Sequence, residues 1–284
     1  MSIKVLERKL MVLTNPSIRE HGSDIPRLGE RTRSILHYGD QLTGRSPHLE
    51  ALHLQEAPGG RTLPRYRWSD PSGKPVYRIG IFAGIHGDEP SGVVAALQIL
   101  DHLSQEADLG RFHEIYVYPV CNPWGFDANR REGESGKDLN RCFWGEAEQE
   151  EEAEVRLLEQ ELRAKAFDAI IALHTDDTSE GIYGYVNGST LTRHLLEPAL
   201  QAASSILPRD IRPEIDTHQA DYSIITGGYK GILSAPPDQH PKPVEIIFEP
   251  PHHAPFGLQV DAHLAALKEI LHLFPQISSQ GMDI

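Results

Sequence analysis

Apolar residues from position 76 onward occur in short runs that alternate with longer amphipathic stretches. Four runs are rich in β-branched and aromatic residues, as is typical of strands; they span residues 76–83, 114–120, 169–173 and 244–248. Three longer stretches place apolar side chains on one side of a helix; they span residues 90–103, 146–165 and 257–274. Strands that alternate with helices predict an α/β domain with a largely parallel sheet.

The first 75 residues lack this periodicity and are rich in Gly, Pro and Arg. We interpret residues 1–75 as an irregular N-terminal part of the same domain, so that residues 1–284 form a single catalytic domain. The opening segment, MSIKVLERKLMVL, lacks the basic head, apolar stretch and cleavage site of a signal peptide. No apolar run is long enough to cross a bilayer, and two cysteines do not make a disulfide framework. These features predict a cytoplasmic protein.

The charge balance limits the kinds of partner. The formal net charge is −14, which argues against binding to nucleic acid or to an anionic membrane, because both need a basic surface. It does not exclude an anionic substrate, since a few well-placed arginines can bind one locally.

His86, Glu89 and His174 directly follow two of the predicted strands. In open α/β sheets, ligands bind beyond the carboxyl ends of the strands. A histidine and a glutamate three residues apart can direct a nitrogen and an oxygen toward one point, and two histidines with one glutamate are a known ligand set for catalytic zinc. The pattern therefore predicts a zinc site. The structural alternative is a loop histidine, a helix-capping glutamate and a histidine bonded at the edge of the core.

A second group of polar residues lies between the second and third predicted strands. Asn140 and Arg141 belong to the segment DLNR, and Arg130 and Arg131 precede it. A guanidinium group can donate two parallel hydrogen bonds to a carboxylate, and an amide adds a further donor. A second arginine could polarise a carbonyl group and stabilise an oxyanion. These residues therefore predict a carboxylate-binding site, unless they are ordinary ion-pairing residues of a surface loop.

Four motifs, GIHGDEPSG, NPWGF, DLNRCF and ALHT, occur in this order. Together they resemble the zinc carboxypeptidase family related to carboxypeptidase A, and within it the bacterial, cytoplasmic murein-peptide amidase-like branch. The aspartoacylase and succinylglutamate desuccinylase group is a more distant resemblance. The family implies a three-layer α/β/α fold with a central mixed, mostly parallel eight-stranded sheet. It also implies one catalytic Zn²⁺ per chain.

Carried onto this sequence, the resemblance implies that His86, Glu89 and His174 bind the metal. It implies that Glu249, in the segment IIFEPP, is the general base. Glu245 lies on the same strand face, four residues earlier, but Glu249 matches the family pattern and ends the strand.

The resemblance further implies that Asn140 and Arg141 bind the terminal carboxylate of the substrate. An arginine before DLNR would polarise the scissile carbonyl; spacing favours Arg131 over Arg130. Tyr222 and Tyr229 both remain candidates for the mobile tyrosine of the family.

Two further features of the loops stay open. His252 and His253 follow Glu249 closely and could be loop histidines or accessory groups. Asp176 and Asp177 could support a second metal, although surface acids are the more ordinary interpretation.

The resulting hypothesis is a zinc-dependent hydrolase that cleaves an amide bond next to a free carboxylate, as a metallocarboxypeptidase or peptide amidase would. Its substrate would be a small peptide or an amino-acid amide. One alternative is an N-acyl amino acid deacylase of the aspartoacylase or succinylglutamate desuccinylase type. The other is an inactive relative that binds metal without catalysis.

Overall fold

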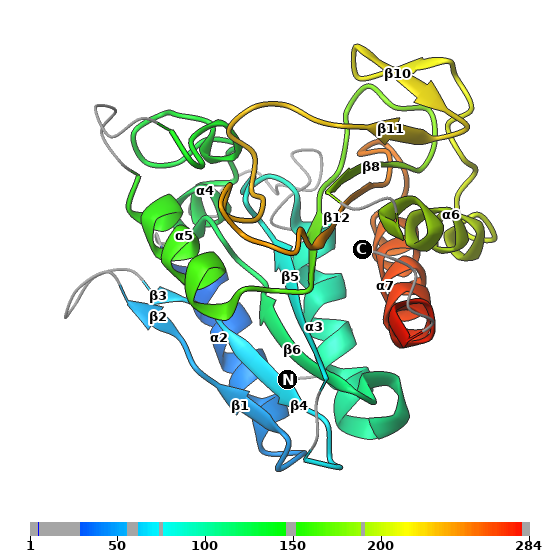
Figure 1. Ribbon diagram of the computed structural model, residues 1–284. Coiled ribbons are helices and arrows are strands. Elements are labelled where there is room, and N and C mark those ends of the chain that lie inside the picture. Colours follow the sequence, from blue (N-terminus) through cyan, green and yellow to red (C-terminus); the bar gives the residue numbers. More distant parts are fainter. Residues whose placement is uncertain are drawn as a thin grey trace.

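The computed structural model describes Val5 and residues 29–55, 62–73, 76–145, 152–188 and 191–279. Its centre is a ten-stranded sheet (Figure 1). From one edge to the other, the strands are β1 (Leu49–Ala51), β4 (Tyr66–Ser69), β6 (His113–Tyr118), β5 (Tyr77–Ala83), β7 (Ala169–Leu173), β12 (Val244–Glu249), β8 (Tyr183–Gly188), β11 (Ile224–Thr226), β10 (His218–Asp221) and β9 (Glu214–Ile215). The expected count of eight strands is therefore too low, because the edges of the sheet carry strands of only two to four residues, too short for a clear alternating pattern.

The centre of the sheet consists of the four strands that the apolar runs predict. β6, β5, β7 and β12 are parallel to one another. The flanking strand β8 is antiparallel to β12, and β4 is antiparallel to β6, so that the sheet is mixed. The carboxyl ends of the four parallel strands lie at the same edge, which is where the predicted site residues follow them.

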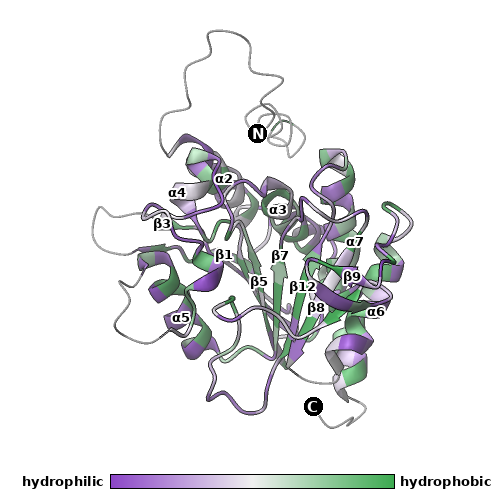
Figure 2. Cartoon of the chain, turned by 90° about the horizontal axis from the view of Figure 1, so that it is seen from above, coloured by the Kyte–Doolittle hydropathy of each residue, from purple (hydrophilic) through white to green (hydrophobic). Residues whose placement is uncertain are grey.

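Helices cover both faces of the sheet and confirm the three-layer α/β/α architecture. One face packs against four helices: α2 (Glu30–Thr43), α3 (Pro90–Gln105), α6 (Leu191–Ala203) and α7 (Phe256–Ser279). The other face packs against α5 (Ala153–Lys165) (Figure 2). Side chains of the central strands alternate between the two cores: Ile81 contacts the first, and Phe82 the second.

The N-terminal part is more regular than the sequence pattern suggests. α2 buries Ile35, Tyr38 and Leu42, and β4 joins the sheet beside β6. The spacing of these three residues is helical, but the stretch is short and flanked by Gly and Arg, which hides the signal. Between β1 and β4 in the sequence, β2 (Leu54–Gln55) and β3 (Thr62–Leu63) pair as a separate two-stranded sheet. Most of residues 1–28 lies outside the described ranges.

Two other expectations concern helices. The helix predicted over residues 146–165 begins at Ala153 in the structure, and residues 146–151 lie outside the described part of the chain. None of the helices among the described residues is both long and apolar enough to cross a membrane.

Candidate active site

The turn that follows β5 places His86 and Glu89 at the carboxyl edge of the sheet. Gly84 has φ +60, in the left-handed region, which lets the chain turn directly after the strand. At Gly87 the backbone passes so close to Gly125 that an added Cβ would lie 1.9 Å from its carbonyl carbon. Helix α3 then begins at Pro90, whose fixed φ suits a first helical position. The sequence GIHGDEP therefore specifies this turn.

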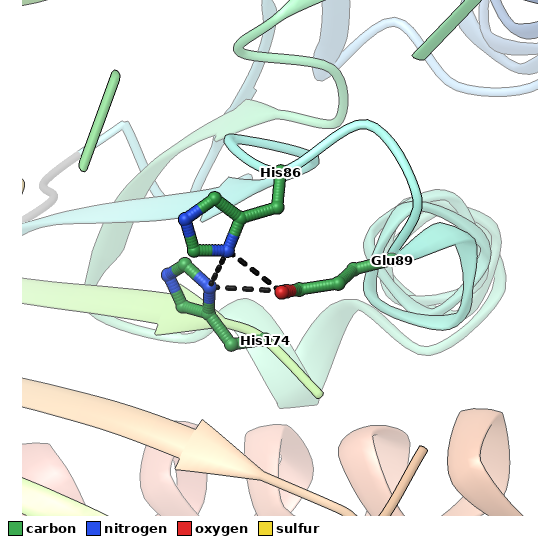
Figure 3. A group of neighbouring side chains, drawn as sticks. All are labelled: His86, Glu89 and His174. Carbon is green, nitrogen blue, oxygen red and sulfur yellow. Dashed lines mark hydrogen bonds and ion pairs between the residues drawn. The ribbon is translucent and has the colours of Figure 1, made fainter. Parts of the chain in front are cut away.

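His86, Glu89 and His174 direct three ligand atoms toward one point (Figure 3). The two Nδ1 atoms of His86 and His174 are 3.2 Å apart. Glu89 Oε1 lies 2.7 Å from His86 Nδ1, and Glu89 Oε2 lies 3.0 Å from His174 Nδ1. Ligands of a tetrahedral zinc ion at about 2.0–2.1 Å are separated by roughly 3.3 Å. All three residues are buried; His86 and Glu89 lie in the turn after β5, and His174 follows β7.

The contacts of the outer atoms support a metal-binding arrangement. His86 Nε2 lies 3.1 Å from Asp138 Oδ1 and can donate its proton there. The lone pair of Nδ1 then faces the other two candidate ligands, which is the tautomer that metal binding needs. The backbone N–H of Thr175 donates to Glu89 Oε2 at 3.0 Å and fixes this carboxylate.

The charges around the three residues also favour a cation. Burial opposes ionisation of Glu89, yet His86 and His174 hold the pKa of this carboxyl well below its ordinary value. Burial likewise disfavours a charged His86, but Glu89 and Asp138 raise its pKa to about 9. Burial lowers the pKa of His174. The negative potential that attracts a proton to His86 equally attracts a metal ion, and the residues present therefore fit one.

Glu249 ends β12 and lines the cavity beside the three candidate ligands. Burial and the neighbouring Glu89 carboxylate raise the pKa of Glu249. Glu245 lies elsewhere: it accepts hydrogen bonds from Asn187 Nδ2 and the Ala235 N–H, each at 2.6 Å. Of the two glutamates that the sequence left open, only Glu249 reaches the cavity.

The two adjacent arginines have different environments. Arg131 lines the cavity, donates to Asp138 Oδ2 from Nε and Nη2 at 3.2 and 3.0 Å, and places Nη1 3.5 Å from Glu89 Oε1. Arg130 is exposed, with its guanidinium 5.9 Å from the Trp124 ring centroid, and it is not part of the cavity wall. The structure thus places Arg131 at the site and Arg130 outside it.

Asn140 and Arg141 also line the cavity. Asn140 Oδ1 accepts the Leu233 N–H at 2.8 Å, which leaves its NH₂ group as a donor. Arg141 donates to the Asn140 carbonyl at 2.8 Å and lies 4.1 Å from the ring centroid of Tyr229. Both side chains therefore present donors to the cavity.

The two candidate tyrosines, Tyr222 and Tyr229, also differ in their position relative to the cavity. Tyr229 forms part of the cavity wall. Tyr222 is exposed and stacks with Arg209 away from the cavity. Tyr229 is thus the tyrosine that the structure places at the site.

The cavity has a volume of about 520 Å³. Its wall also includes Tyr183, Tyr185, Asp216, Gly228, Ile232 and Ile247. Asp176 and Asp177 line it too, and Asp176 accepts hydrogen bonds from Thr178 and Tyr183. His252 also lines the cavity, whereas His253 does not. Within the described ranges, the His86, Glu89 and His174 group is the one cluster that could hold a metal, and Asp176 and Asp177 belong to no second one.

Sequence reasoning missed one residue that connects the parts of the site. Asp138 accepts from His86, from Arg131 and from the Asn140 N–H, at 3.1, 3.0 and 2.8 Å. It begins the DLNR segment, so a signal was present, but no local pattern shows that its carboxylate contacts a residue 52 positions earlier. Asp216 and Tyr185 were missed for the same reason.

The fold is that of known and candidate metallopeptidases. A candidate metallopeptidase from Shewanella baltica OS155 superimposes with a TM-score of 0.70 at 24% identity, over 85% of this chain and 92% of that chain. Bovine thrombin-activatable fibrinolysis inhibitor gives 0.67 at 19% identity, over 86% and 97%. A metallo-carboxypeptidase from Burkholderia cenocepacia gives 0.66 at 16% identity, over 87% and 69%. These likenesses define the class as the metallocarboxypeptidase fold.

The sequence comparison adds a second finding. Residues 75–209 match the model of the succinylglutamate desuccinylase/aspartoacylase catalytic domain, which is the group that the sequence analysis placed second. No curated protein matches the chain. The domain match and the structural likenesses agree in that both resemble the broad group of carboxypeptidase-like and desuccinylase/aspartoacylase-like proteins. The matched segment carries the candidate metal ligands and DLNR but ends before Glu249, so it does not separate the branches.

Proposed function

We propose that this protein is a zinc-dependent hydrolase that cleaves an amide bond next to a free carboxylate, as a metallocarboxypeptidase or peptide amidase. The observation that carries the proposal is the shared cavity. It brings the three candidate metal ligands, the carboxylate of Glu249 and the donors of Arg131 and Arg141 together.

His86, Glu89 and His174 would hold the metal, with the Asp138 carboxylate fixing the orientation of His86. When bound, zinc makes water a stronger nucleophile at neutral pH and acts as a Lewis acid toward a carbonyl oxygen. These three residues line a cavity of about 520 Å³, which has room for substrate and water.

Glu249 would act as the general base. It would take a proton from the attacking water and return it to the leaving amine. A raised pKa suits this role, because a base with a pKa nearer neutrality both accepts and releases a proton readily. Arg131 would donate hydrogen bonds to the oxyanion that forms as the water attacks the carbonyl carbon.

Arg141 and the NH₂ group of Asn140 would bind the substrate carboxylate. A guanidinium matches a carboxylate with two parallel hydrogen bonds, and the contact of Arg141 with the Tyr229 ring limits its orientation. These donors place the carboxylate beside the scissile bond, which selects the end of a peptide or an amino-acid amide.

The test is hydrolysis by the zinc-loaded protein of a peptide series, measured with free and with amidated C-termini. We expect cleavage only of the free-carboxylate series, and loss of cleavage on chelation. In Arg141→Met, kcat/KM for the free-carboxylate peptides should fall about 100-fold or more. Equal hydrolysis of both series would contradict the carboxylate-binding role.

The second candidate function is N-acyl amino acid deacylation, which the desuccinylase/aspartoacylase match favours. Hydrolysis of N-acetylaspartate or N-succinylglutamate without peptide cleavage would select this alternative. An inactive metal-binding relative is the third, and a zinc-loaded protein that cleaves none of these substrates would select it.

A further inference from the structure

His252 lies in the loop that follows β12, and hydrogen bonds hold its backbone beside the loop that follows β7. The His252 N–H donates to the Asp176 carbonyl at 2.7 Å, and the Asp176 N–H donates to the Pro250 carbonyl at 3.2 Å. The side-chain amide of Gln259, a buried residue, donates to the His252 carbonyl at 2.8 Å. The backbone of His252 is therefore fixed, while its exposed side chain lines the cavity.

The two nitrogens of the His252 ring have different surroundings. His252 Nδ1 lies 3.2 Å from Thr175 Oγ1, and the backbone N–H of Thr175 donates to Glu89 Oε2. Within the described part of the chain, no residue hydrogen-bonds to His252 Nε2. When a hydroxyl donates to Nδ1 of a neutral histidine, the ring carries its proton on Nε2. The contact with Thr175 can therefore fix a ring that has one N–H donor available for a ligand.

The candidate metal ligands and Glu249 separate His252 from Arg141. Contacts along the cavity wall connect His252 and Arg141 by two routes. The first runs in order through Thr175, Glu89, Arg131, Asp138 and Asn140. The second runs in order through Asp176, Tyr183, Tyr185, Asp216 and Tyr229. Glu89, a candidate ligand, is part of the first route, and Glu249 pairs with Tyr183 of the second route across β12 and β8. The catalytic groups therefore lie between the two ends of the cavity.

We propose that His252 is a specificity-determining residue that binds the acyl side of the substrate, with Nε2–H donating to a carbonyl oxygen beyond the scissile bond. This inference rests on the proposed function, in which the substrate carboxylate binds Arg141 and the scissile bond lies beside Glu249, so that the acyl group extends toward His252. The acceptor should be uncharged, because Asp177 also lines the cavity, next to Asp176, and would repel an anionic acyl group. The preferred substrate is therefore a peptide with a further amide before the scissile bond, not a simple N-acyl amino acid.

The first experiment compares kcat/KM of the zinc-loaded protein for two substrates with the same C-terminal amino acid and acyl chains of equal length. The acetylglycyl substrate carries an amide beyond the scissile bond, and the pentanoyl substrate has only methylene groups there. We expect the acetylglycyl substrate to be better by at least about 5-fold, because it alone supplies an acceptor for the His252 donor.

Four variants test whether His252 causes this preference. In His252→Phe, which keeps a ring but has no donor, the preference should fall below about 2-fold, whereas His252→Gln should retain part of it. Thr175→Val should reduce the preference in the wild-type background and have no further effect in His252→Phe, because the hydroxyl acts through the ring. His253→Phe is the matched control, since that exposed histidine is not part of the cavity. A preference that survives in His252→Phe overturns the assignment.

A second experiment separates this inference from the reaction. Calorimetry measures binding of the two ketomethylene analogues, in which a CH₂ group replaces the scissile N–H, to wild type and His252→Phe. If neither substrate is cleaved but wild type binds the acetylglycyl analogue at least about 5-fold more tightly and the variant does not, the proposed function is wrong and the assignment of His252 stands. If the substrates are cleaved but wild type binds the two analogues equally, or binds neither, the proposed function stands and the assignment is overturned.

Discussion

Glu245 and Glu249 lie on the same face of β12, but their carboxylates have opposite surroundings. Glu245 is closed off by two hydrogen bonds of 2.6 Å, from Asn187 and from the backbone of Ala235. Glu249 faces the cavity, and within the described residues no hydrogen-bond donor contacts its carboxylate; burial raises its pKa. The carboxylate of Glu249 is free to exchange protons with bound water, whereas the hydrogen-bonded carboxylate of Glu245 stabilises the fold.

This difference predicts the effect of two matched substitutions. Glu249→Gln should lower kcat by about 10²–10⁴ with little change in stability, because it removes the proton acceptor. Glu245→Gln should keep kcat and lose about 1–3 kcal/mol of unfolding free energy, because its NH₂ group would face a buried donor. Initial rates and urea unfolding of both variants check this. Full activity of Glu249→Gln would remove it from the base role.

Substitution of either candidate histidine ligand should weaken zinc binding. His86→Ala and His174→Ala should each weaken zinc affinity by more than about 100-fold, because even outer contacts of a metal site are worth 10–100-fold. Metal content by mass spectrometry after dialysis against a buffered zinc solution checks this. His253→Ala is the control, because that exposed histidine is not part of the cavity.

Removing the metal should also lower stability. At a free zinc concentration of 100 times Kd, the bound ion stabilises the folded protein by about 2.7 kcal/mol. Thermal unfolding of wild type should therefore shift downward on chelation. The melting temperature of His86→Ala should not respond to the chelator, and an equal shift in that variant would argue against zinc at this site.

The two neighbouring arginines predict unequal effects. Arg131→Ala should reduce kcat by about 10²–10³, because it removes a donor to the developing oxyanion. Arg130→Ala should change kcat little, since its side chain is exposed and lies outside the cavity. Steady-state kinetics on one substrate compares them. A larger loss in Arg130→Ala would reverse the assignment.

His113 predicts a pH dependence of stability. It is fully buried, contacts the Leu271 carbonyl through Nε2 at 2.9 Å, and has a pKa lowered by burial. Below the ordinary histidine pKa of about 6.5, the unfolded chain therefore binds one more proton than the folded one at this position. Its contribution is present above that pH and is lost, at up to about 1.4 kcal/mol per pH unit, as the pH falls toward the folded pKa.

His113→Gln should make this slope shallower below about pH 6.5, by at most one proton, because glutamine does not titrate and can still donate to Leu271. Urea unfolding across the pH range measures the slope for both proteins. An unchanged slope would mean that His113 is not the residue that titrates.

The sequence predicted the parts of the fold and site that depend on local pattern. The four central strands and the residues at their carboxyl ends could be read directly, because apolar runs and neighbouring polar residues lie together in the chain. Arg131 could not be separated from Arg130, since the distinction depends on Asp138 and Glu89, which contact Arg131 through the fold. The sequence also gave no hint of Asp216, because its turn meets the cavity only through Tyr185 and Tyr229.

The short edge strands escaped prediction for a different reason. β9 and β11 have two and three residues, and such lengths are stabilised by pairing with neighbours, not by their own periodicity. The helix α2 was overlooked although Ile35, Tyr38 and Leu42 have helical spacing. The residues around it do not follow the alternation of strands and helices from which the elements after position 76 were predicted.

The position of β12 has a consequence for the synthesis of the protein. This strand is the last of the sheet in the sequence, but it lies in the middle, between β7 and β8. A ribosome-bound chain that lacks residues 244–249 has two separate groups of strands and no Glu249. Because chains emerge N-terminus first, the central sheet stays divided until residues 244–249 have been made. On the proposed mechanism, the same six residues therefore complete both the sheet and the catalytic group.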